Sequence, residues 1–212
     1  MLDPKTLRLY LCTDRALAKG RPLLEALEAA LIGGVSLVQL REKEFSGREF
    51  FFFAREMLAL TNRYNVPLII NDRLDIALAV GAAGVHLGQD DLPLAAARRL
   101  AGKHFIIGVS ARNPKDAVLA EQEGADYLGC GAVFPTGTKA GAGVIGFQGL
   151  AEVVGAVKIP VVGIGGIGPD NAADIMAAGA AGVAVISAIL SQDDIRGAAA
   201  ELRTIVDPSE RA

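Results

Sequence analysis

The chain has 212 residues, of which 51% are hydrophobic, and it holds 25 glycines but only eight phenylalanines, three tyrosines and no tryptophan. The formal net charge is −3 and the sequence has no basic run, which disfavours nucleic acid as a partner. No apolar run approaches the roughly 18 residues of a membrane helix, so we expect no membrane span either.

This length suits one domain with a full hydrophobic core. We expect a single domain over 1–212, with the core at about 7–205 and a disordered tail at 206–212. The N-terminal apolar stretch is too short for a signal peptide. Cys12 and Cys130 are far apart, so we expect two buried small side chains and neither a disulfide framework nor a metal cluster. These features favour a cytoplasmic protein.

Short apolar, β-branched runs recur along the chain, and each is bounded by Gly, Ser, Asn or a charged residue. Such runs predict buried strands. Ala- and Leu-rich stretches with helical spacing lie between them. The predicted strands cover residues 7–14, 36–42, 67–72, 84–89, 105–110, 126–131, 160–166 and 182–187.

The stretches between the strands carry helix signals. RPLLEALEAALIGG places Leu23, Leu27 and Leu31 on one helical face and ends in a glycine pair typical of a helix C-terminus. Pro114 and Pro169 each stand at a first-turn position, and each predicts the start of a helix there.

Eight alternations of strand and helix without a linker predict an α/β fold with a parallel sheet. At this length we favour a single compact (β/α)8 TIM barrel. A doubly wound open sheet is the alternative, although it would more often show fewer strands and a glycine-rich first turn. The recurring GG-V-SLVQL, GAAGVHL, GADYLGC and GAAGVAVI support the barrel, because each predicts a helix-ending glycine and a short turn into a strand.

The active site of such a barrel lies at the carboxyl ends of its strands. The second predicted strand carries Gln39 and Arg41 and leads to Lys43; alternate residues share a face, so we expect all three to point the same way. Two cations on one inward face repel each other unless an anion lies between them. The alternative is an ion pair of Arg41 with Glu42 or Glu44.

Asn71 and Asp72 end the third predicted strand, and Asp91 follows the fourth. Carboxylates at two neighbouring strand ends resemble a site for Mg²⁺, which prefers a few carboxylates, several waters and substrate phosphate oxygens. The alternative is that Asp72 and Asp91 cap the helices that follow them. The two roles are compatible, so both stay open.

The two histidines give no clear catalytic signal. We expect His86, inside an apolar strand, to be a hydrogen-bonded core residue, and His104, beside Lys103, to be exposed. The sequence offers no Ser/His/Asp or Cys/His arrangement that would support a nucleophile.

The fifth predicted strand ends in Ser110, and the last two end in Gly163–Gly166 and Ile186–Ser187. Glycines let backbone N–H groups approach a ligand, and barrels often bind phosphate after strands seven and eight. Tight turns without a ligand are the alternative. Together with Arg41 and Lys43, these ends would give the mouth two anion sites, as an enzyme that joins two phosphorylated molecules needs.

Six motifs stand in order along the chain: VQLREK, INDRLDIALAVGAAGVHLGQDD, IGVS, GADYLGCGAVFPTGTK, VVGIGGI and GVAVISAI. In this order and at this spacing they resemble the thiamine-phosphate synthase family over nearly the whole chain. The resemblance implies a compact barrel and a transferase of thiamine biosynthesis. Such an enzyme would use Mg²⁺ to join hydroxymethylpyrimidine diphosphate to a thiazole phosphate, or to its carboxylated form. The products would be thiamine monophosphate and pyrophosphate.

The resemblance also implies roles for individual residues. Those that bind the pyrimidine diphosphate would be Gln39, Arg41, Lys43, Asn71, Ser110 and Lys139. Those that bind the thiazole phosphate would be Thr136, Gly137, Thr138, Gly166, Ile186 and Ser187. Asp72 and Asp91 would bind Mg²⁺, and Arg41, Ser110 and Lys139 would carry catalysis.

The family reaction is a dissociative substitution, in which diphosphate leaves, a pyrimidine-methyl cation forms and the thiazole nitrogen attacks it. That nitrogen has no proton to lose, so no general base is needed and the catalytic load is electrostatic. One departure is that the loop after Lys139 reads AGAGVIGFQ, blander than in relatives. We expect the glycines of this segment to let the loop close over the substrates as a lid.

Two rival functions remain at this point. A thiazole tautomerase on the same barrel would need an acid/base residue but neither the Asp72 and Asp91 pair nor a second anion site. A non-catalytic phosphate-ligand sensor would have little reason to keep both aspartates together with Lys139. We therefore expect small-molecule substrates rather than a nucleic acid or a membrane, and leave a homo-oligomer open.

Overall fold

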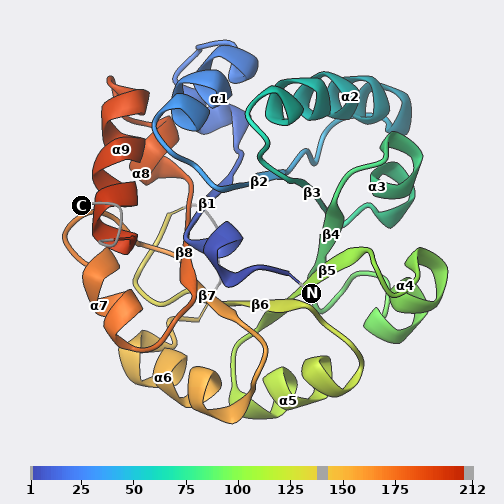
Figure 1. Cartoon of the computed structure of the whole chain (residues 1–212), viewed down its shortest axis with the longest axis vertical. Helices are drawn as coiled ribbons and strands as arrows, with labels where there is room; N and C mark the ends of the chain where they lie inside the picture. The colour runs from blue at the N-terminus through green and yellow to red at the C-terminus, as the bar shows by residue number, and fades with distance from the viewer. Residues whose placement is uncertain (1, 138–142, 208–212) are drawn as a thin grey trace.

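The computed structural model of the protein describes residues 2–137 and 143–207. Eight parallel strands close into a barrel, each paired with the next and the last with the first, inside a ring of helices (Figure 1). The (β/α)8 prediction is confirmed, and the pairing of Leu9 with Val183 excludes the open sheet. The strands are β1 Leu9–Cys12, β2 Leu37–Leu40, β3 Leu68–Asn71, β4 Gly84–Leu87, β5 Ile106–Ala111, β6 Tyr127–Gly131, β7 Val161–Ile164 and β8 Gly182–Val185.

Helices follow the strands in chain order and form the outer layer. They are α1 Leu23–Ile32, α2 Gly47–Arg63, α3 Leu74–Val80, α4 Leu94–Ala101, α5 Pro114–Gln122, α6 Gly146–Ala156, α7 Ala172–Ala177, α8 Ser187–Leu190 and α9 Ile195–Val206. Two short 3-10 helices, Pro4–Leu7 and Arg15–Ala18, flank β1. No helix among the described residues is long and apolar enough to cross a membrane.

All eight predicted strands exist, but several end earlier than their apolar runs suggest. β2 ends at Leu40 because the N–H of Arg41 donates to Thr13 Oγ1, 3.1 Å away, instead of continuing the ladder. β3 ends at Asn71 because Asp72 has a φ of 64°, a left-handed conformation that no strand can hold. Both polar residues therefore stand in the loops that form the mouth.

The helix signals are confirmed with one exception. Leu23, Leu27 and Leu31 are all buried on one face of α1, and Pro114 opens α5. The predicted helix start at Pro169 is wrong, because α7 begins only at Ala172. Asn171 holds the preceding segment in a turn: its Oδ1 accepts from the N–H of Gly168 at 2.9 Å, and its Nδ2 donates to the carbonyl of Gly166 at 3.0 Å.

The recurring glycine pattern has the conformation that it predicts. Gly34, Gly81, Gly124 and Gly179 have φ values of 100°, 73°, 94° and 88°. A residue with a Cβ rarely adopts this left-handed region, so each glycine lets a helix end and turn sharply into the next strand.

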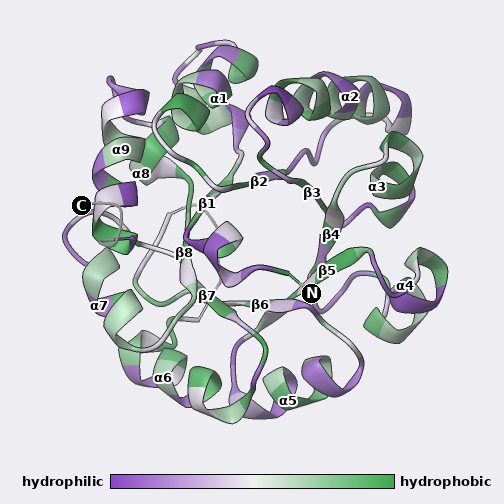
Figure 2. Ribbon diagram, viewed as in Figure 1, coloured by the Kyte–Doolittle hydropathy of each residue, from purple (hydrophilic) through white to green (hydrophobic). Residues whose placement is uncertain are grey.

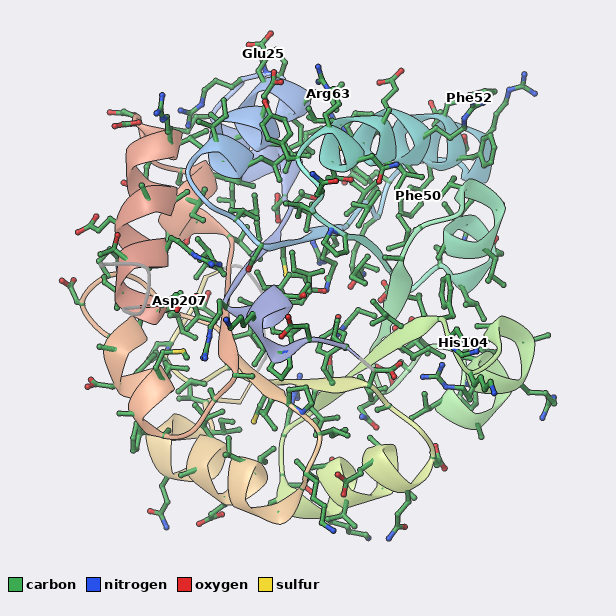
Figure 3. The ribbon with its side chains drawn as sticks, in the orientation of Figure 1. Glu25, Phe50, Phe52, Arg63, His104 and Asp207 are labelled. Atoms are coloured by element: carbon green, nitrogen blue, oxygen red, sulfur yellow. The ribbon has the colours of Figure 1, made fainter. Side chains whose placement is uncertain are left out.

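The core has two layers. The outer layer packs the helices against the barrel: Phe50 points inward from α2 with 1% exposure, whereas Phe52 points outward with 49% (Figure 3). Helices alternate hydrophobic and hydrophilic residues along their length, as this one-sided burial requires (Figure 2). The inner layer fills the barrel with inward side chains of alternate strand positions, including Tyr10 and Tyr127. Leu7 belongs to this layer, so the N-terminal segment closes the end of the barrel opposite the mouth.

Candidate active site

A cavity opens at the carboxyl ends of the strands, and all eight strands or the loops after them contribute to its wall. Most of the described residues predicted for the site line this one cavity. They are Gln39, Arg41, Asn71, Ser110, Thr136, Gly166, Ile186 and Ser187. Thr138 and Lys139 lie outside the described residues.

Asp72 and Asp91 meet at the β3 and β4 side of the mouth. The N–H of Asp72 donates to the carbonyl of His86 at 2.8 Å, and Asp91 Oδ2 accepts from the N–H of Gly88 at 2.6 Å. Neither aspartate caps a helix: α3 and α4 have Arg73 and Pro93 at their N-cap positions, and neither helix has a side-chain cap hydrogen bond. The capping alternative is therefore wrong for both carboxylates.

The environment of Asp72 opposes a second negative charge. Burial, a hydrogen bond with Asp91 and the charge of Asp91 together raise the pKa of Asp72 to about 6. Lys43 and Arg41 act in the opposite direction and lower that pKa, which shows that both cations lie near the pair. A cation between the two carboxylates would remove their repulsion.

This pair fits a hard divalent cation on the chemistry of its donors, which are carboxylate oxygens alone. Within residues 2–137 and 143–207, no group of three or more His, Cys, Asp or Glu residues gathers in a metal-binding arrangement. A metal held by two carboxylates takes its other ligands from water and from substrate oxygens, which is the mode that Mg²⁺ favours.

The strand argument for Arg41 and Lys43 is wrong, because β2 ends before both of them. Arg41 lies on the cavity wall with its Nη1 3.7 Å from Asp14 Oδ2. The alternative, an ion pair of Arg41 with Glu42 or Glu44, is not found among the described residues, and Glu42 instead accepts from Arg15 at 2.8 Å. Among residues 2–137 and 143–207, the guanidinium of Arg41 thus has one ion pair, the long contact with Asp14, and Arg41 lines the cavity.

The opposite side of the mouth is built from backbone. Gly165 and Gly166 have φ values of 98° and 65°. A Cβ on Gly166 would lie 2.7 Å from Phe134 Cβ and 2.7 Å from the Pro135 carbonyl oxygen, so no side chain fits there. This crowding fits the interpretation of Gly166 as part of a tight turn. Gly166 and Ser187 also both line the cavity, so a tight turn and a ligand site are compatible here.

The structure brings together His86 and Ser110, which lie 24 residues apart in the sequence. His86 Nε2 lies 3.0 Å from Ser110 Oγ, and His86 Nδ1 lies 3.0 Å from Tyr127 Oη. The interpretation of His86 as a buried, hydrogen-bonded residue is confirmed, and it also faces the cavity. His104 is exposed and Cys12 and Cys130 are buried, as predicted.

Sequence reasoning missed Tyr10 and Arg112, both of which line the cavity. Arg112 directly follows β5, so its place at a strand end was a usable signal. Tyr10 and Tyr127 are two of only three tyrosines in the chain, and each interrupts an otherwise aliphatic strand. A buried tyrosine needs a partner for its hydroxyl, and that requirement is a second signal.

Comparison with known proteins agrees with this geometry. A family model described as thiamine monophosphate synthase matches residues 9–189. A thiamine-phosphate synthase of Clostridium novyi is 52% identical over 199 residues, which cover 93% of this chain and 98% of the relative. One of Clostridium tetani is 50% identical over 194 residues, 92% of this chain and 93% of the relative.

A solved structure is also closely similar. Thiamine phosphate pyrophosphorylase from Pyrococcus furiosus superimposes with a TM-score of 0.89 at 43% identity, covering 97% of this chain and 98% of the other. A 3-hexulose-6-phosphate synthase shares the fold alone, with a TM-score of 0.72 at 19% identity.

Proposed function

The chain belongs to the thiamine monophosphate synthase family, and we propose that its mouth joins hydroxymethylpyrimidine diphosphate to a thiazole phosphate. The protein is a transferase of thiamine biosynthesis that makes thiamine monophosphate. The observation that carries the proposed site is the pairing of Asp72 with Asp91 beside Arg41 and Lys43. Two carboxylates and two cations together suit a metal-bound diphosphate.

The β2–β4 side of the mouth would hold the pyrimidine diphosphate. Asn71 and Gln39 line its wall and supply neutral donors and acceptors, and Arg41 and Lys43 supply positive charge. An arginine binds phosphate oxygens through a planar pair of N–H groups, which orients the diphosphate as well as attracting it. Lys139 would act on the same diphosphate, and that role remains a prediction from the sequence.

Asp72 and Asp91 would hold Mg²⁺ at this side. When bound, the ion neutralises negative charge on the diphosphate and makes it a better leaving group. Two features would keep these carboxylates in place for the ion: Asp72 has a left-handed backbone directly after β3, and the N–H of Gly88 donates to one oxygen of Asp91.

The β6–β8 side would hold the thiazole phosphate. Thr136, Gly166, Ile186 and Ser187 line this part of the cavity, and hydroxyl and backbone N–H groups are suitable donors to a phosphate. Gly137 is exposed beside Thr136, and we assign it to the same contact. The two anions then face each other across one cavity, with their reacting carbon and nitrogen between them.

The chemistry that fits this mouth is dissociative substitution. Diphosphate leaves with the electron pair of its C–O bond, and the thiazole nitrogen donates the pair that forms the new C–N bond. No proton is lost, so the residues have to stabilise charge and exclude water rather than act as a base. Arg41, Lys43 and the donor from Ser110 would act on the developing diphosphate charge.

One assay tests this function. Purified protein is mixed with both substrates and Mg²⁺, and thiamine monophosphate and pyrophosphate are measured together. We expect equal amounts of the two products and a strong dependence on the metal. Absence of product with and without Mg²⁺ would overturn the proposal, and conversion of a thiazole phosphate alone would instead identify a tautomerase. A cytoplasmic location and a homo-oligomer remain predictions.

A further inference from the structure

A chain of five side chains crosses the inside of the barrel. Gln39 Nε2 donates to Tyr10 Oη at 2.7 Å, and Tyr10 Oη lies 2.8 Å from Tyr127 Oη. Tyr127 Oη lies 3.0 Å from His86 Nδ1, and His86 Nε2 lies 3.0 Å from Ser110 Oγ. The chain joins β2, β1, β6, β4 and β5, and we call it the Gln39–Ser110 relay.

The barrel is shaped around this relay. A Cβ on Gly108 would collide with the ring of Tyr127, and one on Gly129 would lie 3.0 Å from His86 Cε1. Both glycines face inward, so their missing side chains make the space that the two rings fill. The exposed fractions of Tyr127 and His86 are 0% and 8%, so the hydroxyl of Tyr127 is shielded from water and depends on hydrogen bonds within the protein.

The contact from Gln39 is the one whose donor is fixed, and one direction along the relay follows from it with a single hydrogen in each contact. An amide nitrogen can only donate, so Tyr10 Oη accepts from Gln39 and its own hydrogen is free for Tyr127. If Tyr10 gives that hydrogen to Tyr127, the hydrogen of Tyr127 is left for His86 Nδ1, which is then the bare nitrogen of a neutral imidazole. His86 consequently carries its hydrogen on Nε2 and donates it to Ser110 Oγ.

This donor direction determines what the hydroxyl of Ser110 can do. A hydroxyl has one hydrogen, and because Ser110 Oγ accepts from His86, that hydrogen can point to another acceptor. Ser110 and His86 line the cavity, so the acceptor in reach is a bound ligand. The relay thus makes Ser110 a donor, which suits an anion.

The same geometry argues against a nucleophilic serine. A nucleophile needs a histidine that accepts the serine hydrogen and a third group that stabilises the resulting imidazolium. Here the third group is the phenol of Tyr127, and burial raises the pKa of both Tyr127 and Tyr10 well above the ordinary value. Both phenols therefore resist ionisation, so their hydroxyls can remain donors.

We propose that His86 and Tyr127 are positioning residues that fix the Ser110 hydroxyl as a hydrogen-bond donor to the diphosphate. This role rests on the proposed function for the identity of the anion. The direction of the relay does not rest on it, so the two can fail separately.

The first test is the tautomer of His86, measured by nitrogen-15 NMR on protein labelled in its histidine side chains. His104→Gln leaves a single histidine and assigns the signals. We expect hydrogen on Nε2 and a bare Nδ1 in the wild type, and a mixture of tautomers in Tyr127→Phe. Tyr64→Phe is the matched control, because Tyr64 donates to Glu28 and takes no part in the relay, so Nε2–H should persist.

The second test is a double-mutant cycle on kcat/KM for the pyrimidine diphosphate. We expect Tyr127→Phe to cost about 10-fold in the presence of Ser110 and less than about 2-fold in Ser110→Ala, because Tyr127 acts through that hydroxyl. Equal costs in both backgrounds would reduce Tyr127 to a structural role and overturn the proposal. Hydrogen on Nδ1 in the wild type would overturn it too, since the relay would then run the other way. If the wild-type protein had no synthase activity, only the proposed function would be overturned. The tautomer of His86 would still decide the donor direction of the relay.

Discussion

The two sides of the mouth are built for anions by different means. The β2–β4 side presents charged side chains, with Asp72 and Asp91 close enough to perturb each other. The β6–β8 side presents backbone and small residues, and its Gly166 has no room for a Cβ. A side-chain site depends on which groups are present, whereas a backbone site depends on shape. Substitutions should therefore act on charge at one side and on geometry at the other.

The largest effect should follow loss of a carboxylate at the charged side. We expect Asp91→Asn to lower kcat by about 10²- to 10³-fold at saturating substrates, because the metal and the charge stabilisation it provides are lost together. Asp90→Asn is the matched control: Asp90 is exposed, whereas Asp91 is half-buried and pairs with Asp72. Steady-state rates over a Mg²⁺ titration measure both. Equal rates for the two variants would remove Asp91 from the site.

The next effect tests the backbone side. Gly166→Ala should raise KM for the thiazole phosphate by about 10- to 100-fold, because a Cβ at a φ of 65° must displace Phe134 or Pro135. KM for the pyrimidine diphosphate should change little. Gly168→Ala is the control in the same loop, since a Cβ there meets nothing within 4 Å. If Gly166→Ala raised both KM values equally, the division of the mouth into two sides would fail.

A smaller effect is expected when a cavity cation that does not bind the metal is removed. Arg41→Gln should raise KM for the pyrimidine diphosphate by about 10-fold, the value of one charge-assisted hydrogen bond. KM for the thiazole phosphate should stay within about 2-fold. Arg15→Gln serves as the control, because Arg15 pairs with Glu42 outside the cavity wall. Parallel loss of affinity for both substrates in Arg41→Gln would contradict a one-sided role.

The smallest effect concerns stability without metal. Since the pKa of Asp72 is about 6 in the folded protein and lower when unfolded, the folded state resists ionisation, and this lowers its stability as pH rises from about 4 to 6. Asp72→Asn should therefore raise Tm at pH 7 by on the order of 2 °C in metal-free protein, while abolishing most activity. The gain should vanish below about pH 4. Calorimetry at both pH values, with Asp90→Asn alongside, measures it; a lower Tm at pH 7 would refute the repulsion.

The fold was predictable because its signals are local. Apolar runs and helix-ending glycines such as Gly81 depend only on neighbours in the chain. The predicted end of β2 and the predicted start of α7 were wrong because a side chain binds the backbone there. Thr13 accepts from the N–H of Arg41 and ends β2, and Asn171 holds the segment before α7 in a turn. Such contacts join segments that the sequence does not show to be adjacent.

The sequence predicted which residues would line the site, but not which residues on neighbouring strands would contact each other. Residues with charge or an amide at strand ends pointed to the mouth, and most of them line it. The contact of His86 with Ser110 could not be foreseen, because it depends on the pairing of His86 with Gly108, which places Ser110 one pleat higher on β5. Register between parallel strands is set by packing of the whole barrel and leaves no local trace in either strand.

Closure of the barrel between β8 and β1 has a consequence for biosynthesis of the protein. Leu9 emerges early from the ribosome, but its partner Val183 is among the last residues of the sheet to be made. Until then β1 and the newest strand both present unpaired backbone, which invites pairing with other chains. A nascent chain that stalls before β8 would remain an open sheet with two unpaired edge strands. Rapid completion of the chain should therefore protect this protein from aggregation, as the stability of the folded barrel does later.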